Sequence, residues 1–574
     1  MSEIVTASEN VTASENVTAP ESFNGGDLLV RVLREHGVGV VFGVVSVHNL
    51  PLVEAVDRDL RFVAVRHEAA AVNAADAYAR ASGGLGCALT STGTGAGNAA
   101  GSLVEALSAG SRVLHVTGNI ESGFLGGGRG VIHETKDQLG MLTAVSKHAA
   151  TVRDAETAGA TLREAVACAL AAPTGPASIE WPIDLQYARQ HDHSSPQPSS
   201  SNASAPDSRS LDLDAETRGA LARAAGKLAA ARRPIIWAGG GAKEAAEELR
   251  ELAERLGAAI LTSNAGRGTV PEDHRLVVGN FATSPAAAGL LADADLMLSV
   301  GTHFRSNETK DYRLALPAEH IQIDVDPEAI GRVYPATTGL VGDAASLLAA
   351  LVEALPETTS ADADWAERAA ATRAAVRAKL RSDIGVYAQI CDALRERLPA
   401  ASPIARDVTI PSSQWGNRLL EILDPGTNVF PLGGGIGQGL AMGIGAALAR
   451  PQVPTLVIAG DGGLQVHLGE LATLAQEAPW LVLVVFNDGG YGVLRNMQDA
   501  SMQRRSGVDL FTPDFGKLAA SMAMPYHLVR DARDFDAAWE KALAERRPVV
   551  IEVDVTALGP TPVPFTPPVS VPQA

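Results

Sequence analysis

The chain has 574 residues, of which 46% are hydrophobic and 20% are charged, a balance that excludes a wholly disordered protein. Its 47 basic and 66 acidic side chains leave a formal charge of −19, which argues against general binding to nucleic acid or to an anionic membrane. The sequence has no long uncharged apolar run, its three cysteines form no CxxC pair, and we expect no signal peptide, because the first thirty residues show no basic region followed by an apolar core. We therefore expect a cytoplasmic protein without a structural zinc site.

The N-terminal half begins with a tail and continues into an α/β pattern. Residues 1–22 repeat the segment VTASEN and are expected to form a disordered tail. From 23 to 189, apolar segments such as GVVFGVV, GCALTST, RVLHVTG and ASIEWPI alternate with amphipathic helical stretches. Strands separated by helices favour a parallel sheet that is covered on both faces. This range is the first expected domain.

Two more α/β blocks follow. Residues 190–213 are rich in Ser, Pro and Asn and read as a linker, and 214–355 hold the strand-like segments PIIWAGGGA and DLMLSVG. An acidic linker and a long helix are expected over 356–384, then a third block over 385–558 and a Pro-rich tail over 559–574. The predicted fold is three doubly wound α/β domains with mostly parallel sheets.

The strongest chemical signal lies in the third block. Gly460-Asp461-Gly462 follows the apolar segment TLVIA, and Asn487-Asp488-Gly489-Gly490 follows LVLVVF. A parallel sheet binds ligands beyond the carboxyl ends of its strands, so the two turns should lie side by side. Glycines and a helix N-terminus suit a phosphate, and carboxylate oxygens suit Mg²⁺. The sequence therefore predicts a site for a diphosphate and a metal.

This spacing resembles the signature of thiamine diphosphate (ThDP) enzymes, and the wider chain resembles the acetolactate synthase and benzoylformate decarboxylase group. The likeness runs from about Phe23 to Val555 and implies a pyrimidine-binding domain, a central domain and a diphosphate-binding domain, in that order. It also implies ThDP and Mg²⁺ as cofactors. Its implied metal ligands are Asp461, Asp488 and the backbone carbonyl of Gly490. Asp488 stands where the group commonly has Asn, which keeps an oxygen ligand but adds a negative charge beside the diphosphate.

The resemblance implies further cofactor contacts in the third domain. The large apolar residue that holds the cofactor bent is expected at Ile436, within LGGGIGQG, and Gly434 offers a backbone group to the aminopyrimidine. Glycines at such positions permit close approach of the backbone. The segment DVTIPSSQW aligns with a loop that contacts the diphosphate, where Thr409 is the candidate hydroxyl, and Gly462 and Gly463 belong to the same cofactor site.

The first domain supplies the other half of the implied site. Glu68, in RHEAAA, aligns with the Glu that hydrogen-bonds N1′ of the aminopyrimidine and activates the cofactor. Asn98, in TSTGTGAGN, keeps the residue type of a cofactor loop, and His48 and His133 are candidate catalytic residues, because histidine transfers protons near neutral pH. The group builds each site from two subunits, so a homodimer or homotetramer with interfacial active sites is expected.

The implied reaction is cleavage or formation of a carbon–carbon bond next to a carbonyl, usually of a 2-oxo acid. An acetolactate synthase-like carboligase or decarboxylase is favoured by GRGTVPEDH and IQIDVDPEAIGR in the central domain. A benzoylformate-type decarboxylase, or a lyase that acts on 2-hydroxy ketones or hydroxyacyl compounds without decarboxylation, stays open, because Met497 replaces the Trp of authentic anabolic synthases. The resemblance also implies a structural FAD, a less favoured addition, which would lie at the glycine run AGGGA (238–242) and at THFRSNETK (302–310) of the central domain.

Two other classes fit the sequence less well. A nicotinamide or flavin oxidoreductase would be expected to show GxGxxG opening a βαβ unit with an acidic residue about 20 positions later, and none is found. A binding protein that only keeps the scaffold would be expected to lose Glu68 or Asp461, and both are present.

Overall fold

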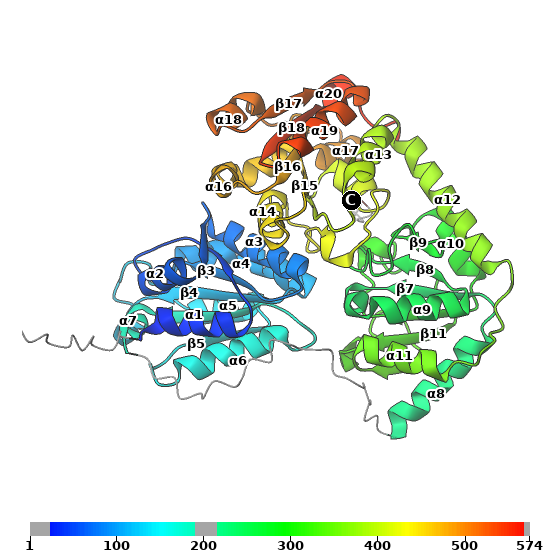
Figure 1. Ribbon diagram of the computed structural model, residues 1–574, viewed down its shortest axis with the longest axis horizontal. Helices are drawn as coiled ribbons and strands as arrows, with labels where there is room; N and C mark the ends of the chain where they lie inside the picture. The colour runs from blue at the N-terminus through cyan, green and yellow to red at the C-terminus, as the bar shows by residue number, and fades with distance from the viewer. Residues whose placement is uncertain (1–22, 190–214, 568–574) are drawn as a thin grey trace, which may run out of the picture.

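The computed structural model describes residues 23–189 and 215–567, which form three α/β domains (Figure 1). Each domain contains one six-stranded sheet in which every strand pairing is parallel. The expected fold class is therefore confirmed. The predicted tail at 1–22, the linker at 190–213 and the last part of the C-terminal tail, 568–574, lie outside the described residues.

The first domain has the strand order β2-β1-β3-β4-β6-β5. The order turns back between β1 and β3, and loops that follow strands at such a switch point form the usual ligand crevice of an open parallel sheet. Its strands are β1 (Val40–Gly43), β2 (Arg61–Ala64), β3 (Gly86–Thr90), β4 (Val113–Asn119), β5 (His148–Thr151) and β6 (Ala177–Pro182). Its helices are α1 (Gly25–Glu35), α2 (Leu50–Asp59), α3 (Glu68–Ser82), α4 (Thr94–Ala109), α5 (Gln138–Val145), α6 (Ala158–Leu170) and α7 (Ile183–Tyr187).

The central domain has the order β12-β11-β10-β7-β8-β9, with its switch point between β7 and β10. This arrangement is the strand order of dinucleotide-binding sheets. Its strands are β7 (Pro234–Ala238), β8 (Ala259–Thr262), β9 (Val277–Gly279), β10 (Leu296–Val300), β11 (Glu319–Asp324) and β12 (Thr338–Val341). Its helices are α8 (Ala215–Ala230), α9 (Ala246–Leu256), α10 (Pro285–Asp293) and α11 (Ala344–Ala354), and α12 (Trp365–Ile384) leads to the third domain.

The third domain, β14-β13-β15-β16-β18-β17, repeats the topology of the first, with its switch point between β13 and β15. Its strands are β13 (Ile404–Arg406), β14 (Asn428–Val429), β15 (Thr455–Gly460), β16 (Leu481–Asn487), β17 (Tyr526–Val529) and β18 (Val549–Asp554). Its helices are α13 (Tyr387–Arg397), α14 (Gly439–Ala449), α15 (Asp461–Leu464), α16 (Glu470–Glu477), α17 (Gly492–Ser501), α18 (Phe515–Ser521), α19 (Phe535–Ala544) and α20 (Val555–Leu558).

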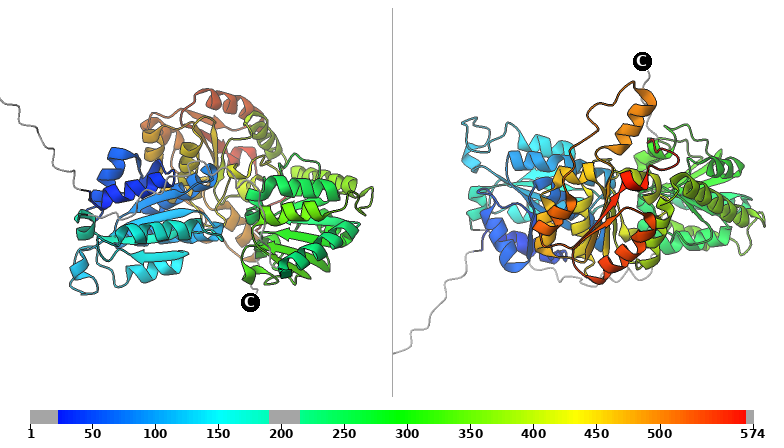
Figure 2. Two further views of the ribbon diagram at one scale, coloured as in Figure 1. Left: turned by 60° about the horizontal axis from the view of Figure 1, so that its bottom comes forward. Right: turned by 90° about the horizontal axis from the view of Figure 1, so that it is seen from above.

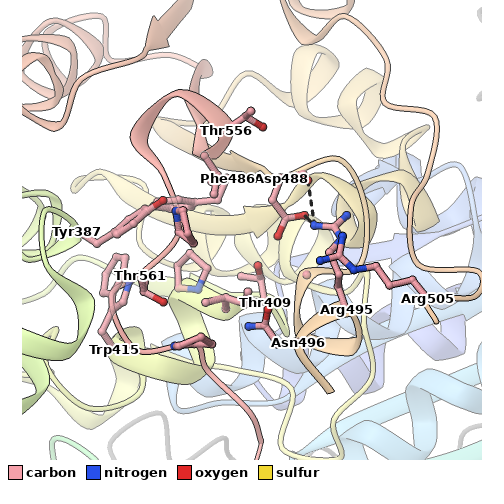
Figure 3. A pocket seen from close by; sticks show the side chains of 16 residues that line it. Tyr387, Thr409, Trp415, Phe486, Asp488, Arg495, Asn496, Arg505, Thr556 and Thr561 are labelled. Atoms are coloured by element: carbon pink, nitrogen blue, oxygen red, sulfur yellow. Dashed lines mark hydrogen bonds and ion pairs between the residues drawn. The ribbon is translucent and has the colours of Figure 1, made fainter. Parts of the chain in front are cut away.

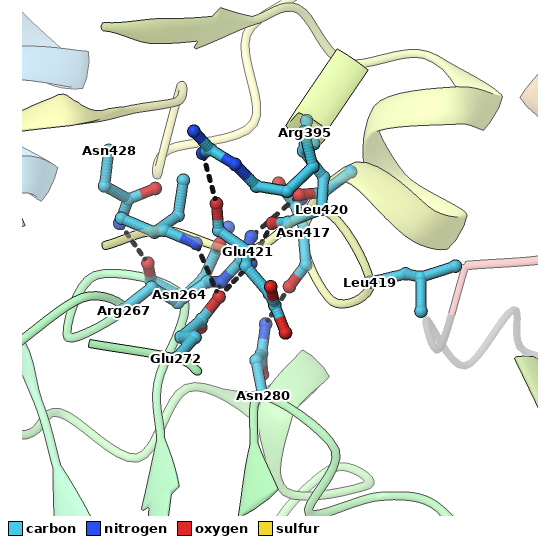
Figure 4. Close-up of polar contacts among 12 residues, drawn as sticks. Asn264, Arg267, Glu272, Asn280, Arg395, Asn417, Leu419, Leu420, Glu421 and Asn428 are labelled. Carbon is cyan, nitrogen blue, oxygen red and sulfur yellow. Dashed lines mark hydrogen bonds and ion pairs between the residues drawn. The ribbon is translucent and has the colours of Figure 1, made fainter. Parts of the chain in front are cut away.

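The third domain contacts both of the others, as the views in Figures 1 and 2 show. Helix α3 of the first domain packs against α14, where a side chain on Gly445 would collide with the carbonyl of Ala74. The small residues of α3 and α14 thus let two helix backbones approach closely. On the other side, a buried ion pair of the central domain, Arg267 with Glu272, hydrogen-bonds to the backbone of the third domain (Figure 4).

In the described residues, no helix is long and apolar enough to cross a membrane.

Candidate active site

The two acidic turns of the third domain lie side by side at the carboxyl ends of neighbouring strands. Strands β15 and β16 pair along their length, so that Gly460 lies opposite Phe486 and the chain delivers Asp461 and Asp488 to the same edge. The backbone N–H of Asp488 donates to Oδ1 of Asp461 at 3.1 Å. Thr512 donates its hydroxyl to Oδ2 of Asp461 at 3.2 Å.

Burial and mutual repulsion disfavour the charged forms of these two carboxylates. Burial raises the pKa of Asp461, and burial together with the charge of Asp461 raises the pKa of Asp488 to about 6. The Oδ1 atom of Asp488 is buried and accepts no hydrogen bond, and its neighbouring cation is Nη1 of Arg495 at 3.5 Å. A cation placed between the carboxylates would relieve both effects, so the residues fit a divalent metal.

A backbone carbonyl can complete this set. A Cβ atom added to Gly462 would lie 2.7 Å from the carbonyl oxygen of Gly490, which shows that this oxygen points toward the turn that carries Asp461. Within the described chain, no group of three or more His, Cys, Asp or Glu side chains is arranged to hold a metal. A metal here would therefore use two carboxylates and backbone or cofactor oxygens, which is the usual preference of Mg²⁺.

The glycine-rich loop before α14 is held by Asp407, which sequence analysis missed. The N–H of Gly437 donates to both carboxylate oxygens of Asp407, at 2.9 and 3.0 Å, and burial raises the pKa of this carboxyl to about 6. Gly434 and Gly437 have φ angles of +87° and +82°, which favour glycine. Between them, Ile436 leaves 40% of its surface exposed and is available to an incoming molecule.

Thr409 and Gly463 border the same loop. A Cβ on Gly460 would lie 2.8 Å from the hydroxyl of Thr409, and one on Gly463 would lie 3.1 Å from Oδ2 of Asp407. The loop after β13, the turn after β15 and the loop before α14 therefore meet at the switch point of the third sheet. The signal for Asp407 was its place directly after a strand, two residues before Thr409.

Glu68 lies at the first turn of α3, at the edge of the first domain. Its Oε2 accepts a hydrogen bond of 3.0 Å from the side-chain amide of Asn98. A Cβ on Gly95 would lie 2.7 Å from Oε1, so this glycine makes room for the carboxylate. The structure thus brings together Glu68 and Asn98, two residues that were predicted separately.

The structure also brings His48 and His133 together. Their Nδ1 atoms are 3.3 Å apart and their rings meet edge to face, with centroids 5.3 Å apart. Side chains on Gly93 and Gly118 would collide with the backbone of His133 and His48, so these glycines let both loops lie on the ends of β3 and β4. Burial, followed by the positive charge of His133, lowers the pKa of His48.

Within one chain, the two parts of the predicted site meet beside Glu68, where the rings of His67 and His467 have centroids 5.2 Å apart and Nδ1 of His467 lies 2.9 Å from the carbonyl oxygen of Gly437. Among the described residues, no hydrogen bond joins Glu68 to Asp461 or Asp488. The domains are instead joined behind Glu68, where the N–H of Arg66 donates to Oε1 of Glu470 at 2.9 Å. The loop that presents Glu68 is therefore anchored on α16 of the same chain.

The segments assigned to FAD make packing contacts. A side chain on Gly239 would collide with the carbonyl of Gly301, so the glycine run closes on the neighbouring turn. Arg305 donates to the carbonyls of Leu432 and Ser108, at 2.8 and 2.5 Å, and links the central domain to the other two. The strand order suits a dinucleotide, but these two segments already have partners within the chain.

Three family models match the chain. They describe a thiamine pyrophosphate enzyme N-terminal TPP binding domain over residues 23–141, a central domain over 221–351 and a C-terminal TPP binding domain over 411–553. Thiamine pyrophosphate (TPP) is another name for ThDP. A probable 2-ketoarginine decarboxylase of Pseudomonas aeruginosa is 34% identical over 519 residues, which cover 90% of each protein.

The chain belongs to the thiamine pyrophosphate enzyme family. A probable acetolactate synthase large subunit of Methanocaldococcus jannaschii is 28% identical, covering 92% of this chain and 91% of that protein. The acetolactate synthase large subunit of Haemophilus influenzae is 27% identical, covering 87% and 88%. The expected family, an enzyme with TPP-binding domains, is therefore confirmed. The roles of individual site residues stay predictions.

Proposed function

We propose that the protein is a ThDP- and Mg²⁺-dependent enzyme that decarboxylates a 2-oxo acid, or joins it to a second carbonyl compound. The observation that carries this proposal is the pair of turns bearing Asp461 and Asp488, with a buried carboxylate oxygen that lacks a hydrogen bond and the Gly490 carbonyl facing them. The relatives are named as a probable 2-ketoarginine decarboxylase and as acetolactate synthases, which supports this substrate class.

Thiamine diphosphate, when bound, supplies the carbon nucleophile and the electron sink of the reaction. Asp461, Asp488 and the Gly490 carbonyl would hold Mg²⁺ and, through it, the diphosphate. Ile436, Gly434 and Thr409 would shape the cofactor site, together with Gly462 and Gly463. Glu68, fixed by Asn98, would hold a proton at the aminopyrimidine.

The histidine pair favours decarboxylation that ends in protonation, and hence an aldehyde product. Two imidazoles whose Nδ1 atoms are 3.3 Å apart can share one proton, and burial opposes a second charge on His48. A pair of this kind beside the site is a suitable proton donor. The carboligase outcome, which needs a second carbonyl substrate, is the alternative.

We further propose that two copies of the chain complete each site. The support is that, among the described residues, Glu68 is hydrogen-bonded to Asn98 and not to the metal turns, and that its loop is anchored on α16. A homodimer is the smallest assembly that meets this need, and a homotetramer would also meet it. We do not assign FAD, because the two candidate segments pack against the chain itself.

The test is CO₂ release from a panel of 2-oxo acids, with ThDP and Mg²⁺ added and the products identified as aldehyde or hydroxy ketone. We expect turnover by the wild type and a loss of at least about 100-fold in Glu68→Gln, the usual scale for a proton-transfer group. Glu54→Gln, which changes an exposed glutamate of the same domain, is the matched control and should keep full activity. Turnover that survives Glu68→Gln, or wild-type protein that binds no ThDP, would refute the proposal.

A further inference from the structure

The second metal turn carries an additional charge, and the structure contains its counterion. Asp488 is an aspartate beside Asp461, so the turn has two carboxylates in a largely buried place. Nη1 of Arg495 lies 3.5 Å from Oδ1 of Asp488 and donates to its backbone carbonyl at 3.1 Å. The guanidinium is thus attached to both the side chain and the backbone of the same residue (Figure 3).

The position of Arg495 follows from the register of α17. Gly492, Arg495 and Asn496 are three and four residues apart, so they share one helix face, which lines a cavity of about 330 Å³. Leu494 lies on another face and is 48% exposed. The guanidinium therefore reaches Asp488 from the face of α17 that lines this cavity, which Asp488 also lines.

Arg495 also fixes the loop that carries the metal ligands. Its Nε donates to Asp509 at 2.9 Å, and Asp509 forms a backbone bridge with Gly490. The guanidinium thus holds the carbonyl of Asp488 and, through Asp509, the backbone of Gly490, so it constrains both predicted metal ligands. Arg495 therefore helps to fix the position of the turn, although it lies on α17.

We propose that Arg495 is a positioning residue that offsets the charge of Asp488, so that the metal turn keeps the net charge of one carboxylate. Asp461, Asp488 and the guanidinium together carry one net negative charge, as would an aspartate and a neutral amide ligand, and Asp509, the other partner of the guanidinium, is 63% exposed and screened by solvent. Asp488 keeps an oxygen ligand, and Arg495 removes the repulsion that its charge would exert on an anionic diphosphate. This inference rests on the proposed function, because it assumes that Mg²⁺ and ThDP bind at this turn.

The test is a double-mutant cycle read by binding. Calorimetric titration would measure the affinity of Mg²⁺ without cofactor and that of ThDP at saturating Mg²⁺. In Arg495→Gln we expect Mg²⁺ to bind about tenfold tighter and ThDP about tenfold weaker, because the turn then has two net negative charges. In Asp488→Asn we expect Mg²⁺ to bind about tenfold weaker. The double variant should bind both Mg²⁺ and ThDP within about threefold of the wild-type affinities.

Two further variants separate charge from fold. Arg495→Lys keeps the charge and should stay within about threefold of wild type for both ligands. Arg505→Gln removes the other arginine of the cavity, which pairs with Asp499 instead, and should change neither affinity. The melting temperature of each variant without ligands checks its fold.

The inference is overturned if the double variant keeps the altered affinities of Arg495→Gln, or if Arg495→Lys behaves like Arg495→Gln. Both results would leave the proposed function standing, because the wild type would still bind Mg²⁺ and ThDP. Failure of the wild type to bind either ligand would instead refute the proposed function.

Discussion

At the scale of single residues, the contact between His48 and His133 leads to a prediction about the pKa of His48. Two causes lower the pKa of His48, of which burial is the larger and the positive charge of His133 the second. His133→Asn removes the second cause only, so the pKa of His48 should rise but stay below its usual value. The measurement is an NMR titration of the imidazole signals.

The same titration contains its own reference. His36 lies at the end of α1, and its lowered pKa has burial as its main cause, with smaller effects from Glu35 and Arg163. The pKa of His36 should not change in His133→Asn. Because folding lowers the pKa of His48, its contribution to stability is present above the unfolded value and lost as the pH falls below it. An unchanged pKa of His48 in His133→Asn would show that the two rings do not interact electrostatically.

Some site residues could be predicted from sequence, and others could not, for a physical reason. Asp461 and Asp488 directly follow the two most apolar strands of their domain, so their place at the sheet edge follows from the strand pattern. Asp407 and Arg495 act through partners that only the fold supplies, namely the N–H of Gly437 and the carboxylate of Asp488. A buried aspartate or a helical arginine has no such signature by itself.

At the scale of elements, the metal turns depend on a close approach that glycine allows. A Cβ on Gly462 would lie 2.7 Å from the oxygen of Gly490 and 2.8 Å from the ring of Tyr491. Gly462→Ala should therefore push the turns apart and weaken Mg²⁺ binding about tenfold or more, a loss of ~1.4 kcal/mol or more of binding free energy. Calorimetric titration with Mg²⁺ measures it.

The matched control is Gly226→Ala on α8, where an added Cβ meets nothing within 4 Å. Both variants replace a helical glycine by alanine, and this replacement by itself stabilises a helix by roughly 0.5–1 kcal/mol. Only the change at Gly462 should alter Mg²⁺ affinity. Equal Mg²⁺ affinity in the two variants would mean that the turns tolerate the added methyl group.

The strands that sequence analysis missed lie mostly at sheet edges. It found most central strands from their continuous apolar runs, but not β13 inside the third sheet, nor the edge strands β5, β9, β12, β14 and β17. Strand β5 has the sequence HAAT with every residue half-buried, and β14 has two residues. An edge strand has a neighbour on one side only and is often short, so its sequence pattern is weak.

At the scale of the whole molecule, three α/β domains followed from the alternating pattern and their order of roles from the family resemblance, but the contacts between domains followed from neither. The segment GRGTVPEDH was noticed only as a family likeness. In the structure, two of its residues, Arg267 and Glu272, form the ion pair that joins the central domain to the third. Such a junction depends on backbone carbonyls of a distant segment, which no local pattern encodes.

The buried ion pair between Arg267 and Glu272 leads to a prediction about stability. Arg267 is fully buried; it donates to both oxygens of Glu272, at 2.8 and 2.6 Å, and to the carbonyls of Gly416 and Leu420, at 2.7 and 2.6 Å (Figure 4). Replacing one partner leaves the other charge buried without compensation, so Arg267→Met should lower the free energy of unfolding by about 3–5 kcal/mol. Arg381→Met breaks an ion pair with Asp392 that is about 40% exposed and should cost about 1 kcal/mol or less. Denaturant unfolding of both variants decides the matter: equal losses would mean that the buried pair does not hold the two domains together.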